Sequence, residues 1–177
     1  MREDMERILL TEADIQARVE ELGRQISRDF AGREPIFVGV LKGCFIFMAD
    51  LIRSVDLHCT MDFMAVSSYG DGTTTTGAVK INKDLSRDIA GRDVIIVEDI
   101  LDSGVTLSHV IDLLKQRHPA SLKLCALLNK PDRRKIPVQL DYEGFEIPDE
   151  FVVGYGLDYA QKYRNLPYIG ILNFEED

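Results

Sequence analysis

The stretch VIIVEDILDSGVTL, residues 94–107, contains a strand, a turn and the beginning of a helix. Residues 94–97 are a continuous run of β-branched apolar side chains, which is typical of a strand buried on both faces. Small and polar residues follow at 102–104, and the apolar spacing of residues 105–118 indicates a helix. A buried strand that leads directly into a helix is the building unit of a parallel α/β sheet.

The same alternation continues on both sides of this stretch. Thr11, with Asp14 three residues later, resembles a helix N-cap with an acid in the first turn. Apolar residues then recur at helical spacing before Gly32, which can end the helix: Ile15, Val19, Leu22, Ile26 and Phe30. Apolar runs predict strands at 35–41, 61–66, 122–129, 151–159 and 167–174, and residues 42–55 predict a turn and a helix. We therefore expect an α/β fold, with a mainly parallel, twisted sheet flanked by helices.

Composition limits the kinds of protein this chain can be. Its 177 residues suit one domain that buries its own core, with 45% hydrophobic and 29% charged residues. A net charge of -9 argues against a general nucleic-acid binder, which usually needs a basic face. The N-terminal MREDMERILL does not resemble a signal peptide, and no apolar run is long enough to cross a membrane. The three cysteines are widely spaced without a metal-binding pattern, so we expect a cytoplasmic protein with neither nucleic acid nor membrane as partner.

Two segments interrupt the regular alternation. SSYGDGTTTTG, residues 67–77, is rich in glycine and threonine and is the most loop-like part of the chain, so we expect a mobile lid there. Residues 129–150 contain three prolines and predict a small hood beside the sheet. We expect a single domain over residues 1–177, with the hood formed by the N-terminal segment and roughly residues 129–177.

The turn at residues 102–106, DSGVT, has the chemistry of an anion site. It lies beyond the carboxyl end of a buried strand, where α/β sheets bind ligands. Backbone N–H groups at a helix N-terminus, with the hydroxyls of Ser103 and Thr106, can bind a phosphate, and Gly104 allows a tight turn. The pattern is neither G-x-x-x-x-G-K nor G-x-G-x-x-G, which disfavours an ATPase or a dinucleotide dehydrogenase. The alternative is a plain strand-to-helix turn in which the acids cap the helix.

The adjacent acids Glu98 and Asp99 favour the binding site over that alternative. Two neighbouring carboxylates repel each other, and burying them is unfavourable unless something pairs with them. A sugar diol supplies two hydrogen-bond donors, and Mg²⁺ supplies two positive charges. The acids could therefore hold a ribose and its metal ion while the turn holds the 5-phosphate.

At this point the sequence resembles a known family. Residues 94–107 are similar to the phosphoribosyl pyrophosphate motif of the type I phosphoribosyltransferases. The resemblance extends through VGVLKGCFIF, SSYGDGTTTTG, LLNKPDRR and GFEIPDEFVVGYGLDYAQKYRNLPYIG to the bacterial hypoxanthine and hypoxanthine-guanine phosphoribosyltransferases. It implies the type I phosphoribosyltransferase fold with a small hood. It also implies a Mg²⁺-dependent reaction of phosphoribosyl pyrophosphate with hypoxanthine or guanine, which gives IMP or GMP through an oxocarbenium-like transition state.

The resemblance assigns roles residue by residue. Asp102 is implied to be the proton acceptor beside purine N7, with Glu98, Asp99, Ser68 and Tyr69 also at the catalytic centre. The remaining implied roles fall to the following residues: the 5-phosphate loop to Asp102, Ser103, Gly104, Val105, Thr106 and Leu107; pyrophosphate binding to Leu41, Lys42, Gly43 and Arg164; purine binding to Lys130, Phe151, Val152 and Asp158; metal binding to Glu98, Asp99 and Asp158. Read singly, Lys42 and Arg164 would be surface charges, and residues 151–153 an ordinary strand.

Other functions stay open from the residues alone. Within the class, the base could be xanthine, guanine alone or adenine, although Lys130 as a donor to a 6-oxo group speaks against adenine. A purine-sensing regulator with the same fold would need a nucleic-acid-binding surface, and the net charge of -9 disfavours one. A generic nucleotide-binding domain of a larger assembly is a third reading. His58, His109 and His118 match no catalytic position. The family resemblance implies a homodimer or a homotetramer.

Overall fold

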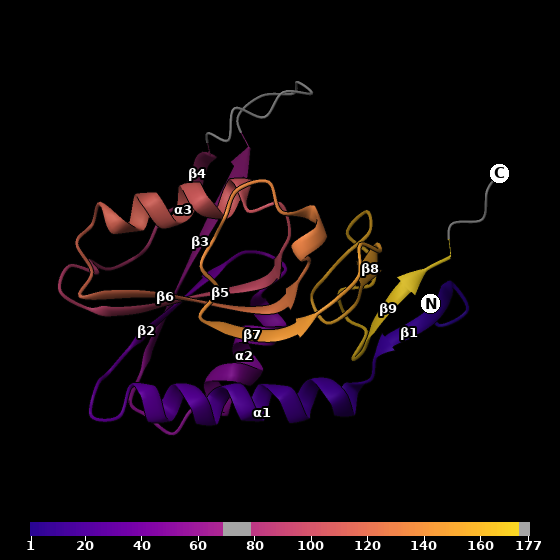
Figure 1. Cartoon of the computed structure of the whole chain (residues 1–177), viewed down its shortest axis with the longest axis horizontal. Helices are drawn as coiled ribbons and strands as arrows, with labels where there is room; N and C mark the ends of the chain where they lie inside the picture. The colour runs from indigo at the N-terminus through magenta and orange to yellow at the C-terminus, as the bar shows by residue number, and fades with distance from the viewer. Residues whose placement is uncertain (69–78, 174–177) are drawn as a thin grey trace.

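The main sheet of the protein has six strands in the order β4-β3-β2-β5-β6-β7, in a computed structural model that describes residues 1–68 and 79–173 (Figure 1). The strands are β2 (Ile36–Val40), β3 (Thr60–Ser68), β4 (Val79–Lys83), β5 (Asp93–Leu101), β6 (Ser121–Asn129) and β7 (Tyr142–Glu146). Every neighbouring pair is parallel except β3 and β4. The mainly parallel α/β sheet predicted from the sequence is thus confirmed.

Helices cover both faces of this sheet. The first helix, α1 (Glu12–Asp29), begins with the predicted cap: Thr11 and Asp14 form a reciprocal capping box. It lies with α2 (Phe45–Arg53) on one face, and α3 (Val105–Lys115) lies on the other (Figure 1). Strand β5 is buried between these layers because its side chains alternate. Ile95 and Val97 join the apolar cluster of α1 and α2, whereas Val94 and Ile96 join the cluster of α3.

A second, smaller sheet joins the two ends of the chain. It is antiparallel, in the order β1 (Met5–Leu10), β9 (Ile169–Leu172) and β8 (Val152–Val153), and lies at one end of the main sheet (Figure 1). The sequence did not predict β1, because its charged side chains obscure the strand pattern; its partner β9 supplies four buried residues.

Two other local expectations differ from the structure. Strand β7 lies in the stretch expected to belong to the hood, yet it extends the main sheet, where Tyr142 pairs with Cys125 of β6. The strand expected at 151–159 is only two residues long, because Gly154, Tyr155 and Gly156 all have positive φ and turn the chain. Within the described ranges, no helix is long and apolar enough to cross a membrane.

Candidate active site

A cavity of about 470 Å³ opens where β2 and β5 end. It is lined by residues from four separate segments: Val40, Leu41, Lys42, Gly43, Val66, Glu98, Asp99, Ile100, Leu101, Asp102, Ser103, Gly104, Thr106, Leu107, Asp158 and Arg164. The structure therefore brings together most of the residues singled out in the sequence, including both acids, the turn and the lysine loop. The carboxyl ends of parallel strands meet at one edge of a sheet, which explains why these segments converge.

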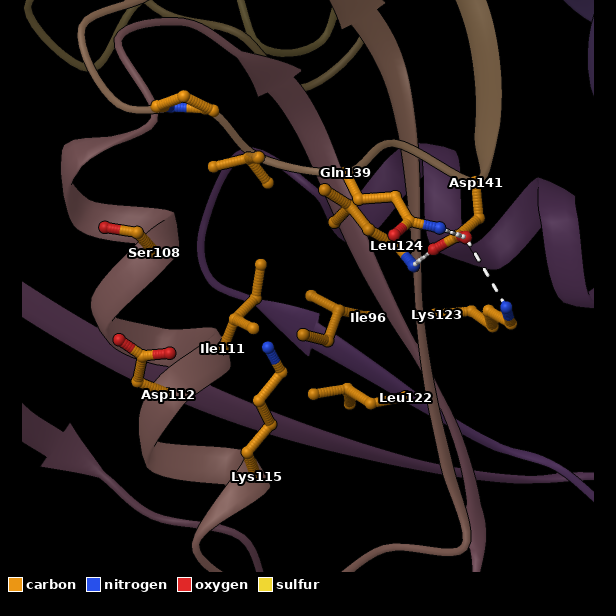
Figure 2. A pocket seen from close by; sticks show the side chains of 12 residues that line it. Ile96, Ser108, Ile111, Asp112, Lys115, Leu122, Lys123, Leu124, Gln139 and Asp141 are labelled. Carbon is orange, nitrogen blue, oxygen red and sulfur yellow. Dashed lines mark hydrogen bonds and ion pairs between the residues drawn. The ribbon is translucent and has the colours of Figure 1, made fainter.

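Another cavity, of about 250 Å³, lies between α3 and β6 and contains none of those residues. Ser108, Asp112 and Lys115 face it from α3, and Asp141 closes the other side with an ion pair to Lys123 (Figure 2). Its cations and acids balance one another, and it lies away from the carboxyl ends of the strands. The cavity at β5 is therefore the candidate site.

The acid pair is partly buried and lines that cavity. Burial is the main reason why the pKa of Glu98 lies well above its ordinary value, and the negative charge of Asp99 raises this pKa further. Burial also raises the pKa of Asp99, although a hydrogen bond from the Ile100 N–H and the nearby charge of Arg164 oppose the shift. No described residue forms an ion pair with either acid within 4.0 Å. A ligand that brings positive charge would therefore favour the ionised form of both acids.

Glycine at position 43 makes room for one of these acids. A Cβ built on Gly43 would lie 1.7 Å from Asp99 Oδ2, so the carboxylate occupies the space that a side chain would take. The peptide between Leu41 and Lys42 is cis, and Lys42 is exposed at the rim of the cavity. The lysine loop and the acid pair therefore form one packed unit.

The turn after β5 has the geometry of an anion cradle. Gly104 adopts φ 79° and precedes the first residue of α3, so the N–H groups that begin this helix lie at the cavity. A Cβ on Gly104 would approach the Ile136 carbonyl oxygen to 2.5 Å, which restricts this position to glycine. Ser103 lines the cavity, and its Oγ accepts a hydrogen bond of 3.3 Å from the Val105 N–H. Val105 itself is absent from the lining, whereas Thr106 is exposed there.

The segment after Lys130 supports this turn from behind, a feature that the sequence reading missed. The Ser103 carbonyl accepts the N–H groups of Lys135 (2.9 Å) and Ile136 (3.2 Å). The Arg134 guanidinium donates through Nε to the Asp102 carbonyl at 2.9 Å and through Nη2 to Leu101 at 3.4 Å. The only signal in the sequence was the basic run after Lys130, which does not say which groups it meets.

Asp102 has a buried carboxylate oxygen, Oδ1, that accepts no hydrogen bond from the described residues. Arg133 Nε lies 3.0 Å from this oxygen as an ion pair, without the directional geometry of a hydrogen bond. Arg133 also lies 3.5 Å from Asp149 and is half exposed, so it can move. A buried acceptor lacking a hydrogen bond is a position where a ligand N–H would be stabilised.

Arg164 and Asp158 form the opposite wall. Their side chains make an ion pair of 2.9 Å, and Arg164 Nη1 donates to the Gly156 carbonyl at 2.7 Å. Asp158 Oδ2 accepts the Gln161 N–H at 2.8 Å. These contacts leave the guanidinium directed at the cavity that it lines with Lys42.

Of the residues expected to bind a purine, Asp158 lines this cavity, whereas Lys130, Phe151 and Val152 do not. Lys130 is buried, with its Nζ donating to the Glu150 carbonyl at 2.5 Å and its N–H bonded to Leu101. Phe151 is 46% exposed and meets the ring of Tyr159 edge to face at 5.8 Å. Val152 is buried in β8.

Two of the predicted catalytic residues lie at the start of the expected lid. Ser68 is exposed at the end of β3, whose Val66 lines the cavity. Tyr69 lies outside the described residues. Among the described residues, no cluster of three His, Cys, Asp or Glu side chains is arranged to hold a metal ion by itself.

This fold and site define a phosphoribosyltransferase, and the sequence model of the phosphoribosyl transferase domain matches residues 8–160. The chain belongs to the hypoxanthine and hypoxanthine-guanine phosphoribosyltransferase family. A hypoxanthine-guanine phosphoribosyltransferase of Bacillus subtilis is 52% identical over 97% of this chain and 96% of its own. The crystal structure of a hypoxanthine phosphoribosyltransferase from Staphylococcus aureus matches with a TM-score of 0.95 and 52% identity, over 98% of this chain and 94% of that one.

A longer relative contains a similar chain as one part. The bifunctional protein TilS/HprT of Listeria monocytogenes is 54% identical over 99% of this chain, which spans only 27% of that protein. The similarity therefore extends over the full range of residues that build the cavity.

Proposed function

We propose that this protein is a purine salvage enzyme. It transfers ribose 5-phosphate from phosphoribosyl pyrophosphate to hypoxanthine, and to guanine, and forms IMP or GMP with release of pyrophosphate. The observation that carries this proposal is the convergence of three elements on one cavity: the lysine loop at 41–43, the acid pair and turn at 98–107, and the Asp158–Arg164 wall. Each element suits a different part of phosphoribosyl pyrophosphate.

The turn suits the 5-phosphate. Backbone N–H groups at the start of α3 carry the partial positive charge of a helix N-terminus. The hydroxyls of Ser103 and Thr106 add donors at the same place. Because Gly104 and the Ser103 carbonyl are held by residues 135–136, this cradle is formed before the ligand arrives, which reduces the loss of conformational entropy on binding.

The acid pair suits the ribose and a divalent cation. Glu98 and Asp99 have raised pKa values because they are buried beside each other, so a cation and two ribose hydroxyls would relieve an unfavourable arrangement. The residues therefore fit Mg²⁺: Glu98, Asp99 and Asp158, which all line the cavity, would hold the ion together with substrate oxygens and water. When bound, the ion would neutralise charge on the departing pyrophosphate.

Lys42 and Arg164 suit the pyrophosphate. Both line the cavity, and the planar Arg164 fork can bind two phosphate oxygens at once. Arg164 holds its orientation through the Gly156 carbonyl and Asp158, so little rearrangement is needed. Stabilising the leaving pyrophosphate favours a transition state in which the ribose resembles an oxocarbenium ion.

Asp102 and Lys130 suit the two edges of an oxopurine. Asp102 Oδ1 is a buried acceptor without a hydrogen bond, and we infer that it receives the proton of purine N7 once Arg133 moves aside. Lys130 Nζ can exchange the Glu150 carbonyl for the purine 6-oxo group. Phe151 offers its ring for stacking, and Val152 offers backbone groups at the base edge.

The remaining predictions from the sequence complete the proposal. We infer that the chain is a single domain whose hood is built on the small sheet. Ser68 and Tyr69 would begin a lid at 67–77 that excludes water from the cationic ribose. We further infer a cytoplasmic enzyme that acts as a homodimer or homotetramer.

One assay tests the whole proposal. The purified protein is mixed with Mg²⁺ and phosphoribosyl pyrophosphate, and hypoxanthine, guanine, xanthine and adenine are offered separately while nucleotide and pyrophosphate are followed together. We expect rapid IMP and GMP formation that stops when a chelator is added, with no reaction of adenine. Saturable binding without turnover of any base would refute the enzyme and favour a purine-sensing regulator.

A further inference from the structure

A buried tyrosine connects the two walls of the cavity. Tyr155 is 3% exposed, and its hydroxyl donates a hydrogen bond to Asp50 Oδ2 on α2. Tyr155 has φ 50°, which lies in the left-handed region that residues other than glycine rarely adopt. Its conformation is therefore held by its surroundings. The chain turns there between Gly154 and Gly156, and the Tyr155 N–H donates to the Leu166 carbonyl at 2.8 Å.

The partner of this tyrosine belongs to the opposite wall. Helix α2 begins at Phe45, directly after the lysine loop at 41–43, and Asp50 lies on this helix. The turn and the loop also touch through their backbones, because a Cβ on Gly156 would lie 2.2 Å from the Gly43 carbonyl oxygen. The Tyr155–Asp50 bond and this backbone contact are therefore two points of one junction.

The same junction sets the position of the arginine. Gly156 exchanges two hydrogen bonds with Arg164: its N–H donates to the Arg164 carbonyl at 2.9 Å, and its carbonyl accepts Arg164 Nη1 at 2.7 Å. A shift of the turn at 155–156 must therefore move the guanidinium relative to Lys42. The purine-side residues Lys130 and Glu150 make no contact with this junction among the bonds of the described chain.

We propose that Tyr155 and Asp50 are positioning residues that fix the spacing of Lys42 and Arg164 for the pyrophosphate group. The proposal rests on the function proposed above and adds two residues that touch no substrate. It assigns the Tyr155 hydroxyl an effect on phosphoribosyl pyrophosphate and not on the purine. A hydroxyl that only stabilised the fold would not separate the two substrates.

The test compares Tyr155→Phe with Tyr142→Phe. Tyr142 is a matched control, since it too is buried and its hydroxyl donates to a helix carboxylate, that of Asp29, at 2.7 Å. Loss of a hydrogen bond to the partly buried Asp50 carboxylate should raise the KM for phosphoribosyl pyrophosphate by about 10-fold in Tyr155→Phe, with the KM for hypoxanthine changed by less than about twofold. Tyr142→Phe should change neither KM.

Substitutions of Asp50 test the bond from its other end. Asp50→Asn keeps an acceptor for Tyr155 and should retain a KM for phosphoribosyl pyrophosphate near that of the native protein. Asp50→Ala also removes a hydrogen bond from Gln16 (3.3 Å) and an ion pair with Arg53 (3.7 Å), but neither of these contacts involves the turn at 155–156. The KM of Asp50→Ala for phosphoribosyl pyrophosphate should therefore match that of Tyr155→Phe, and the double variant Tyr155→Phe, Asp50→Ala should be no worse than either. Additive effects would contradict the proposal.

A readout independent of turnover separates this proposal from the enzyme reaction. The Gly156 amide hydrogen should exchange with solvent faster in Tyr155→Phe than in the native protein or in Tyr142→Phe, as measured by NMR. Unchanged exchange, or an equal rise in both KM values, would overturn the positioning role. If the native protein lacks turnover while the difference in Gly156 exchange persists, the proposed enzymatic function is refuted, but the structural role of the Tyr155–Asp50 bond is not.

Discussion

Replacing Gly43 by alanine tests the arrangement of the cavity most directly. The new Cβ would lie 1.7 Å from Asp99 Oδ2 and 2.6 Å from Asp99 Cγ, whereas ordinary contacts begin at 3.4 Å. The carboxylate and the loop must therefore separate by about 1.7 Å (3.4 minus 1.7). Asp99 Oδ1 also holds the Ile100 N–H at 2.9 Å, so moving the carboxylate strains that hydrogen bond.

The size of the effect follows from this displacement. Misplacing a positioned group by ~1 Å lowers turnover by about 10²-fold, so Gly43→Ala should reduce kcat/KM for phosphoribosyl pyrophosphate at least that much. Inserting a methyl group into a packed site should also lower the free energy of unfolding by about 1–3 kcal/mol. The variant should therefore fold, yet be nearly inactive.

Steady-state kinetics and thermal unfolding separate these two effects. Gly91→Ala is the control, because Gly91 has φ 69° with nothing within 4 Å of the added Cβ. Its left-handed backbone should cost about 1 kcal/mol of stability without affecting activity. If Gly43→Ala retained kcat/KM within about threefold, the packed unit of lysine loop and acid pair would not matter for binding, and the assignment of Asp99 would be refuted.

Three further outcomes follow from the same structure. Asp102→Asn should keep the fold and lose about 10²-fold or more in turnover, and near-normal turnover would remove Asp102 as proton acceptor. Lys130→Ala should raise the KM for oxopurines about 10–100-fold through loss of a charged donor, while the KM for phosphoribosyl pyrophosphate stays unchanged. An equal rise in both KM values would instead mean that Lys130 only holds the Glu150 carbonyl in place. The hydrogen bond from Arg117 lowers the pKa of Asp84. It therefore stabilises the folded protein at pH values above the pKa of Asp84 in the unfolded chain, and this stabilisation is lost as the pH falls through the pKa of Asp84 in the folded protein. Because the pair is partly exposed, Arg117→Gln should cost only about 0.5 kcal/mol at neutral pH and nothing in acid, as urea unfolding at two pH values would measure.

The parts of the fold predicted from the sequence depend on short-range patterns. The capping box of Thr11 and Asp14, the apolar run of β5 and the glycine of the turn each act within a few residues, so their meaning is local. The family resemblance implied that the lysine loop and the acid pair share one site, and the structure explains why, because parallel strands place their carboxyl ends together.

The missed features depend on contacts between distant residues. Strands β1, β4 and β7 carry weak patterns of their own and are specified by their partners. The bond of Tyr155 to Asp50 and that of Arg134 to the Asp102 carbonyl join residues far apart in the chain. A lone tyrosine between two glycines, or a basic run after Lys130, does not indicate which group it will meet.

The small sheet has a consequence for the order in which the protein assembles. Its β1 pairs Met5 with Leu172, so almost the whole phosphoribosyltransferase fold lies between these partners in the sequence. Closing so long a loop is slow, and during synthesis β1 emerges from the ribosome long before β9 exists. The strands that carry the phosphate turn can pair earlier. A nascent chain would thus gain its ribose phosphate cradle before its Arg164 wall, so catalytic competence should arise only after β9 has been synthesised and has paired with β1.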